Sequence, residues 1–152
     1  MSIAWALVLA ATKGFVALFA VDAWLHPADR RFRGKAMRPR VVGYLAGLVL
    51  VPIGWRLLPG RRTYPKELDL AVTVPLLLDA AGNSLGIYER AHVDDAVHFT
   101  NAAILSGVAG AIVASQVEHR WQAALIGAGV SVVAEAGWEV MEYSAYRLGA
   151  SG

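Results

Sequence analysis

Three glutamates near the end of the chain have the side-chain type and the spacing to do chemistry. Glu135, Glu139 and Glu142 follow one another at intervals of four and three residues, within an apolar stretch that begins at Trp121. On a helix this spacing puts all three carboxylates on one face. Because carboxylates inside a membrane are costly, they require protons, a basic side chain or a metal ion. If the site is catalytic, Glu139 or Glu142 is the expected general base.

A second polar group opens the preceding apolar stretch. Asp94 and Asp95 lie four and three residues before His98, so either carboxylate could orient the imidazole or share a metal ion with it. Asn101 continues the His98 face by one turn. Metal sites in helical bundles use acidic and histidine side chains at such spacings. The alternative is a structural role, in which Asp95 caps the start of the helix.

Other polar residues lie within the apolar stretches. Asp79 and Asn83 share one helix face, and Lys13 lies in the middle of the first stretch, where it could pair with Asp79 or Glu135. Asn83 and Asn101 are typical hydrogen-bond partners between helices. Oxygen and imidazole groups without cysteine suit Mg, Mn, Fe or Zn. We therefore predict a divalent metal site formed by Asp79, Asp94, Asp95, His98, Glu135, Glu139 and Glu142.

Membrane-spanning helices are the elements expected to position these residues. The 152 residues are 57% hydrophobic and 17% charged, with a mean hydropathy of +0.47. Soluble proteins have roughly 45–50% apolar and about 25% charged residues. A helix needs about 20 apolar residues to span a bilayer. We predict an all-α bundle forming one domain over residues 1–152, with spanning segments at 3–24, 41–58, 68–88, 97–117 and 121–146.

The distribution of basic residues predicts the orientation. Placing the loop between the first two segments inside puts eight basic residues inside and five outside. We predict a protein integral to the plasma (inner) membrane. The positive-inside rule favours an orientation with the N-terminus outside and the C-terminus in the cytoplasm. In this topology Asp79, His98 and Glu135 fall in the inner half of the bundle. The first segment is too long for a signal peptide and contains Lys13.

The basic loop also predicts contact with membrane lipids. Arg30, Arg31, Arg33 and Lys35 could bind anionic head groups, although such a cluster is more often a topology signal. No motif of aromatic and basic residues points to nucleic acid, and no G-x-S-x-G, Walker-type or H-E-x-x-H motif is present.

The order of the acidic, histidine and tryptophan motifs resembles a family of bacterial polytopic membrane proteins, the YjdF-like (DUF2238-type) family. The resemblance covers residues 69–146 and rests on the Asp79–Asn83 region, Asp94-Asp95-x-x-His98-Phe99 and Glu135-x-x-Trp138-Glu139-x-x-Glu142-Tyr143. A more distant likeness to VanZ-type proteins lies in the Asp-x-x-x-His pattern. The resemblance implies a helical membrane protein with a buried acidic and histidine site, but no established activity. It also implies a further acidic segment and helix after the last motif, which a partner chain could supply.

Three functional hypotheses follow from the sequence. The first is a membrane metalloprotein whose metal-bound water attacks a lipid-linked phosphate or ester. The second is a proton- or cation-coupled carrier, with Lys13 and Asp79 in the relay. The third is a non-catalytic accessory or assembly subunit of a homo-oligomer or larger membrane complex.

Overall fold

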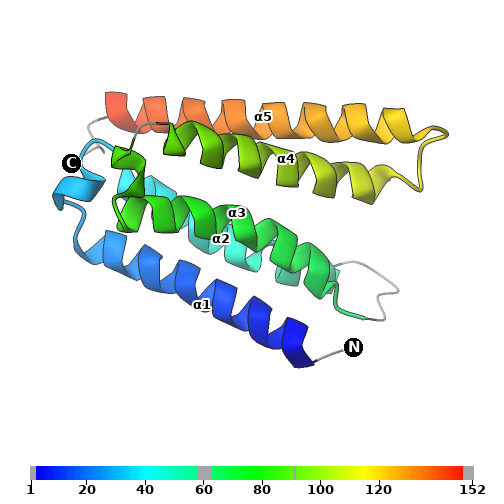
Figure 1. The fold of residues 1–152 in the computed structure, drawn as a ribbon, viewed down its shortest axis with the longest axis horizontal. Helices are drawn as coiled ribbons and strands as arrows, with labels where there is room; N and C mark the ends of the chain where they lie inside the picture. Colours follow the sequence, from blue (N-terminus) through cyan, green and yellow to red (C-terminus); the bar gives the residue numbers. More distant parts are fainter. Residues whose placement is uncertain (1–2, 58–62, 91, 149–152) are drawn as a thin grey trace.

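The fold is a bundle of five α-helices, seen in a computed structural model that describes residues 3–57, 63–90 and 92–148 (Figure 1). The side chains of Glu142 and Ala145 lie outside the described part. No strand occurs in the described ranges, so the predicted all-α fold with five helices is confirmed. The helices are α1 (Ile3–Leu25), α2 (Met37–Leu57), α3 (Lys66–Ser84), α4 (Val93–Val113) and α5 (Arg120–Arg147).

Four of these helices have the length and composition to cross a membrane. They are α1, α2, α4 and the Arg120–Met141 part of α5. Their outer faces expose large apolar side chains such as Leu7, Phe15, Leu50 and Val133. Apolar surface of this extent is unfavourable in water and favourable against lipid. The architecture is therefore typical of an integral membrane protein, while the orientation stays a prediction.

Helix α3 differs from the other four because it contains more buried polar residues than any of them within the described residues. Asp69, Thr73, Asp79, Asn83 and Ser84 are all buried, and α3 contacts α1, α2 and α4. Such groups are tolerated inside a membrane when other helices surround and pair them. The neighbouring helices thus position an internal polar helix, which forms one side of the site described below.

The helix boundaries differ from the predicted segments by up to four residues, and the differences at the end of α3 and at the starts of α2 and α4 affect the site. Helix α3 ends at Ser84 rather than at residue 88, because Gly86 adopts a left-handed conformation with φ of 65° and a short 3-10 helix, η2 (Ile87–Glu89), follows. Helices α2 and α4 each begin four residues earlier than predicted. Their first turns therefore contain Arg40 and the pair Asp94 and Asp95, which all lie outside the predicted segments.

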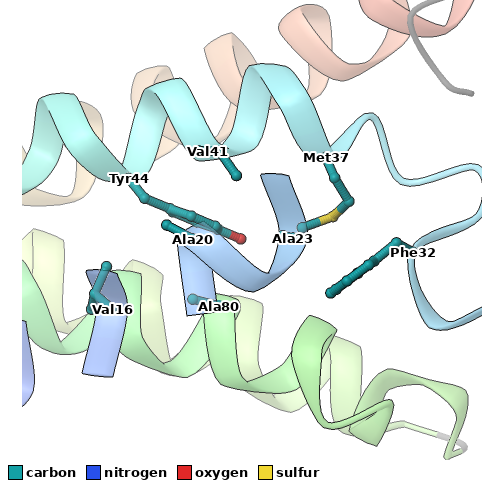
Figure 2. Packing of buried hydrophobic residues seen from close by; sticks show 8 residues of the cluster. All are labelled: Val16, Ala20, Ala23, Phe32, Met37, Val41, Tyr44 and Ala80. Carbon is teal, nitrogen blue, oxygen red and sulfur yellow. The ribbon is translucent and has the colours of Figure 1, made fainter. Parts of the chain in front are cut away.

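The main apolar core lies between α1, α2 and α3. It consists of Val16, Ala20, Ala23, Phe32, Met37, Val41, Tyr44 and Ala80, and Phe32 belongs to a short 3-10 helix, η1 (Arg30–Phe32) (Figure 2). Helix α5 packs mainly on α4, where Gly127 lies so close to the α4 backbone that an added Cβ would overlap it. Trp138 extends from α5 to Gly43 of α2 and closes the bundle on that side.

A partly buried ion pair joins α1 to α3, away from the candidate site described below. The Lys13 Nζ lies 2.8 Å from Asp69 Oδ2 and donates to the Leu48 carbonyl at 2.7 Å. Pro52 has no N–H, so the carbonyl four residues before it lacks its usual helical donor. Lys13 replaces that donor. The expected pairing of Lys13 with Asp79 or Glu135 is therefore wrong, since the side of α1 that bears Lys13 meets the start of α3.

The basic loop between α1 and α2 is partly structural. Arg31 donates to the Ser84 carbonyl at 2.6 Å and lies 2.9 Å from Asp22, so it joins the ends of α1 and α3. Arg30 lies 3.5 Å from Glu89. Binding of anionic lipid by this loop stays a prediction, and Arg31 is already engaged within the protein.

Candidate functional site

The candidate site lies toward the end of the bundle where α1, α3 and α5 end and α2 and α4 begin (Figure 1). One of its two buried charges is Asp79 of α3, which is 8% exposed. The Arg40 Nη1 lies 3.1 and 3.0 Å from the two Asp79 carboxylate oxygens. Arg40 is itself 7% exposed, and its Nε donates to the Lys35 carbonyl at 3.0 Å. Each ion thus offsets the cost of burying the other.

Two tyrosines complete the surroundings of Asp79. Tyr44 of α2 donates a short hydrogen bond to Oδ2, and Tyr88 of η2 donates to Oδ1 at 3.1 Å. The Tyr88 ring lies where a side chain at position 82 would be, so Gly82 makes its position available. Burial, and then the nearby Asp79 charge, raise the pKa of the Tyr88 hydroxyl well above its ordinary value. Both carboxylate oxygens of Asp79 therefore have hydrogen-bond donors within the protein.

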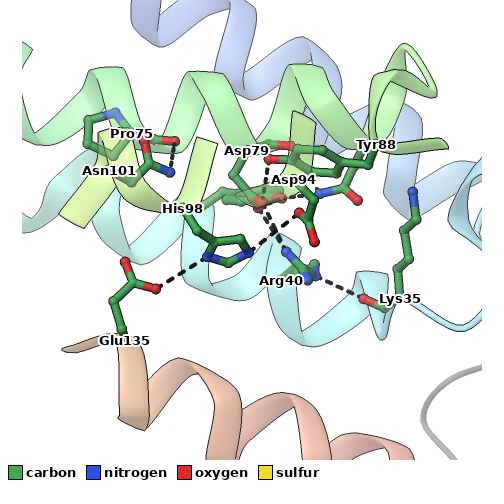
Figure 3. A network of polar contacts seen from close by, with 11 residues as sticks. Lys35, Arg40, Pro75, Asp79, Tyr88, Asp94, His98, Asn101 and Glu135 are labelled. Atoms are coloured by element: carbon green, nitrogen blue, oxygen red, sulfur yellow. Dashed lines mark hydrogen bonds and ion pairs between the residues drawn. The ribbon is translucent and has the colours of Figure 1, made fainter. Parts of the chain in front are cut away.

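A histidine between two carboxylates lies next to this pair. The His98 Nδ1 is 3.3 Å from Glu135 Oε2, and its Nε2 is 3.5 Å from Asp94 Oδ1 (Figure 3). Asp94 and His98 come from α4, whereas Glu135 comes from α5. The sequence spacing explains the Asp94 contact, and the α4–α5 packing brings in Glu135. About a third of the His98 and Glu135 side chains is exposed, compared with 57% for Asp94.

A cavity of about 150 Å³ has both Asp79 and His98 in its wall. Side chains of α2, α3, α4 and α5 line it, including Asp79, His98, Asn101 and Glu135. Most of the remaining wall is apolar, with Leu76 among its residues. The arrangement is that of a small binding pocket with a few convergent polar groups.

The structure brings together some of the predicted site residues and separates others. Asp79, His98, Asn101 and Glu135 line the cavity, Asp94 contacts His98, and Asn83 donates to Tyr44 at 3.4 Å. The Lys13 side chain belongs instead to the Asp69 ion pair. Two predicted ligands, Asp95 and Glu139, are exposed and do not line the cavity, and Asp95 lies 3.7 Å from His92. The Glu142 side chain lies outside the described residues.

The predicted divalent metal stays a prediction. Within the described ranges, no three His, Asp or Glu side chains are grouped as ligands of one ion. Asp79 faces Arg40 and two hydroxyl donors, a surrounding that suits an anion held by protein groups. The two His98 nitrogens face carboxylates on different sides of the ring.

Sequence reasoning missed four residues that shape the site: Arg40, Tyr44, Tyr88 and Trp138. A signal for two of them is present, because Arg40 and Tyr44 are four residues apart and therefore share a helix face. In the sequence, however, Arg40 looks like one of the basic loop residues that set the membrane topology. The Arg40 guanidinium carbon lies 5.3 Å from the centre of the Trp138 ring, a cation–π contact across α2 and α5 that no local spacing predicts.

No protein-family model, curated protein or solved structure matched this chain when it was compared with each of them. The resemblance to YjdF-like proteins therefore stays a prediction.

Proposed function

We propose that this protein is a proton-coupled membrane carrier for a small solute. In this proposal Asp94, His98 and Glu135 carry the proton, and the cavity beside them binds the solute. The observation that supports it most is the position of the His98 ring between two carboxylates. Asp94 of the same helix lies at Nε2, and Glu135 of α5 lies at Nδ1. Intramembrane ionisable residues in such chains are typical of proton relays.

The chemistry of the ring explains why this position suits proton transfer. A neutral imidazole donates from one nitrogen and accepts at the other, whereas the imidazolium donates from both. A proton that Asp94 delivers to Nε2 makes the ring positive. Loss of the Nδ1 proton to Glu135 then restores a neutral ring, with its proton on Nε2 and Glu135 protonated. One proton has moved from the more exposed carboxylate to the cavity wall.

The charged groups around His98 define the rest of the relay. On its own helix the ring faces Asp94, across α5 it faces Glu135, and across the cavity lie Asp79 of α3 and Arg40 of α2. Since Arg40 neutralises Asp79, that pair supplies a fixed wall rather than a second proton carrier. The proposal thus assigns no proton-carrying role to Lys13 or Asp79.

Reconstituted protein tests the proposal. Proteoliposomes with a trapped pH-sensitive dye are given benzylammonium, tetramethylammonium, gluconate or glucose outside, and the internal pH is followed. A carrier changes the internal pH with at least one probe, beyond the change in protein-free liposomes. If none of the four probes moves protons above that baseline, the proposal is wrong.

A further inference from the structure

We infer that the cavity binds a small organic ammonium ion. The inference rests on the proposed function for its role in transport, and it names the solute class of that same site. Three features of the cavity support it. They are the small size and apolar wall of the cavity, the Asn101 Oδ1, which accepts no hydrogen bond from the described residues, and the Glu135 carboxylate, whose charge Arg40 does not offset.

The size of the cavity limits the solute to a few heavy atoms. Its volume of about 150 Å³ equals that of an engineered apolar protein cavity that binds benzene. Pro75, Leu76, Leu105 and Ala134 contribute the apolar part of the wall. One ring or a short branched alkyl group therefore fits, and a long lipid chain does not.

The Asn101 amide provides the unused acceptor. Its Nδ2 donates to the Pro75 carbonyl at 3.4 Å, which fixes the orientation of the amide. Its Oδ1 is buried and has no hydrogen-bond partner among the described residues. A buried acceptor left without a donor has lost its hydrogen bonds to water with no replacement, so a ligand N–H placed there is favoured.

The charges of the wall select a cation. Arg40 offsets Asp79, whereas Glu135 has only His98 as its described partner, and His98 also lies near Asp94. With a neutral imidazole, the His98 side of the cavity is therefore negative. An anionic solute would be repelled, and a neutral one would leave the Glu135 charge without a cation. A primary ammonium has three N–H donors, enough for Glu135 and Asn101 together.

Calorimetric titration of the detergent-purified full chain with benzylammonium tests this inference. Benzyl alcohol and benzoate serve as neutral and anionic probes of similar shape. We expect benzylammonium to bind at least about tenfold more tightly than either, a difference of about 1.4 kcal/mol. Glu135→Gln and Asn101→Leu should each weaken it about tenfold, while Asn101→Asp should strengthen it. Glu139→Gln, one turn further along α5 and exposed, is the matched control and should bind as the wild type does.

Equal binding of benzyl alcohol, preference for benzoate, or equal losses in Glu135→Gln and Glu139→Gln would each overturn the inference. Asn101→Asp keeps the test valid if Asn101→Leu fails to fold. The titration uses no proton gradient, so the two proposals fail separately. Benzylammonium binding without proton movement would contradict only the carrier, and proton movement without ammonium selectivity would contradict only the solute class.

Discussion

Arg40 Nη1 lies 3.0 Å from Asp79 Oδ2, so the first turn of α2 is joined to the last turns of α3 by a pair of buried charges. Arg40→Met leaves the Asp79 carboxylate buried without its cation, which typically costs about 3–5 kcal/mol. Unfolding in mixed detergent micelles should show this loss. The double variant Arg40→Met, Asp79→Leu should recover most of it. Arg33→Met, at an exposed position in the loop before α2, should change stability by less than about 0.5 kcal/mol. Equal losses at Arg33 and Arg40 would contradict the burial argument.

The contact of Lys13 with the Leu48 carbonyl predicts that substitutions at Lys13 and Pro52 are energetically coupled. In the wild type, Lys13→Met removes both the cation beside Asp69 and the donor to that carbonyl. In a Pro52→Ala background, the new backbone N–H at position 52 can serve the carbonyl instead. Lys13→Met should then cost about 1 kcal/mol less than in the wild-type background, measured by a double-mutant cycle. Strict additivity of the two substitutions would show that Lys13 does not replace the missing donor.

The raised pKa of Tyr88 predicts a change in stability at high pH. Folded Tyr88 keeps its proton above the ordinary tyrosine value of 10.0, whereas in the unfolded chain it ionises there. The unfolded state therefore binds fewer protons than the folded state above that pH, and the free energy of unfolding falls as pH rises. Tyr88→Phe should make this fall shallower, in unfolding curves recorded on either side of pH 10. Tyr143→Phe, at an exposed position, should leave the fall unchanged.

Metal removal separates the relay from the metal hypothesis. An ion bound to a His98 nitrogen would occupy a position that the relay needs for its proton. Treatment with a strong chelator should therefore leave proton movement unchanged, as measured by the dye-loaded proteoliposomes. A stoichiometric divalent ion in purified protein, lost in His98→Ala, together with loss of proton movement on chelation, would favour the metal hypothesis instead.

The helices of this fold could be predicted because apolar runs of spanning length are a direct sequence signal. Apolar composition alone did not reveal that α3 differs from its neighbours. Its charges at Asp69 and Asp79 are paired by Lys13 and Arg40 from other helices, so its burial depends on tertiary partners. Helix starts were placed four residues late at α2 and α4, because polar residues in a first turn look like loop residues.

The candidate site could be predicted only in part, for a similar reason. The local spacing indicated the Asp94–His98 contact, and relative depth indicated that Asp79, His98 and Glu135 lie in the inner half of the bundle. Depth does not determine how each helix is rotated about its axis. Glu135 therefore faces the cavity while Glu139 is exposed, and Lys13 meets Asp69 rather than Asp79. Arg40 could not be recognised as a site residue because the positive-inside rule already accounts for a basic residue in that loop.

The most direct test of the relay measures proton movement and solute binding in the same His98 variant. His98→Gln keeps a polar side chain but removes the proton carrier, and His119→Gln, at the start of α5, is the matched control. The relay predicts that His98→Gln still binds benzylammonium within about threefold of wild type while its solute-driven proton movement falls at least about tenfold. Wild-type proton movement in His98→Gln would contradict the relay, as would an equal loss in His119→Gln.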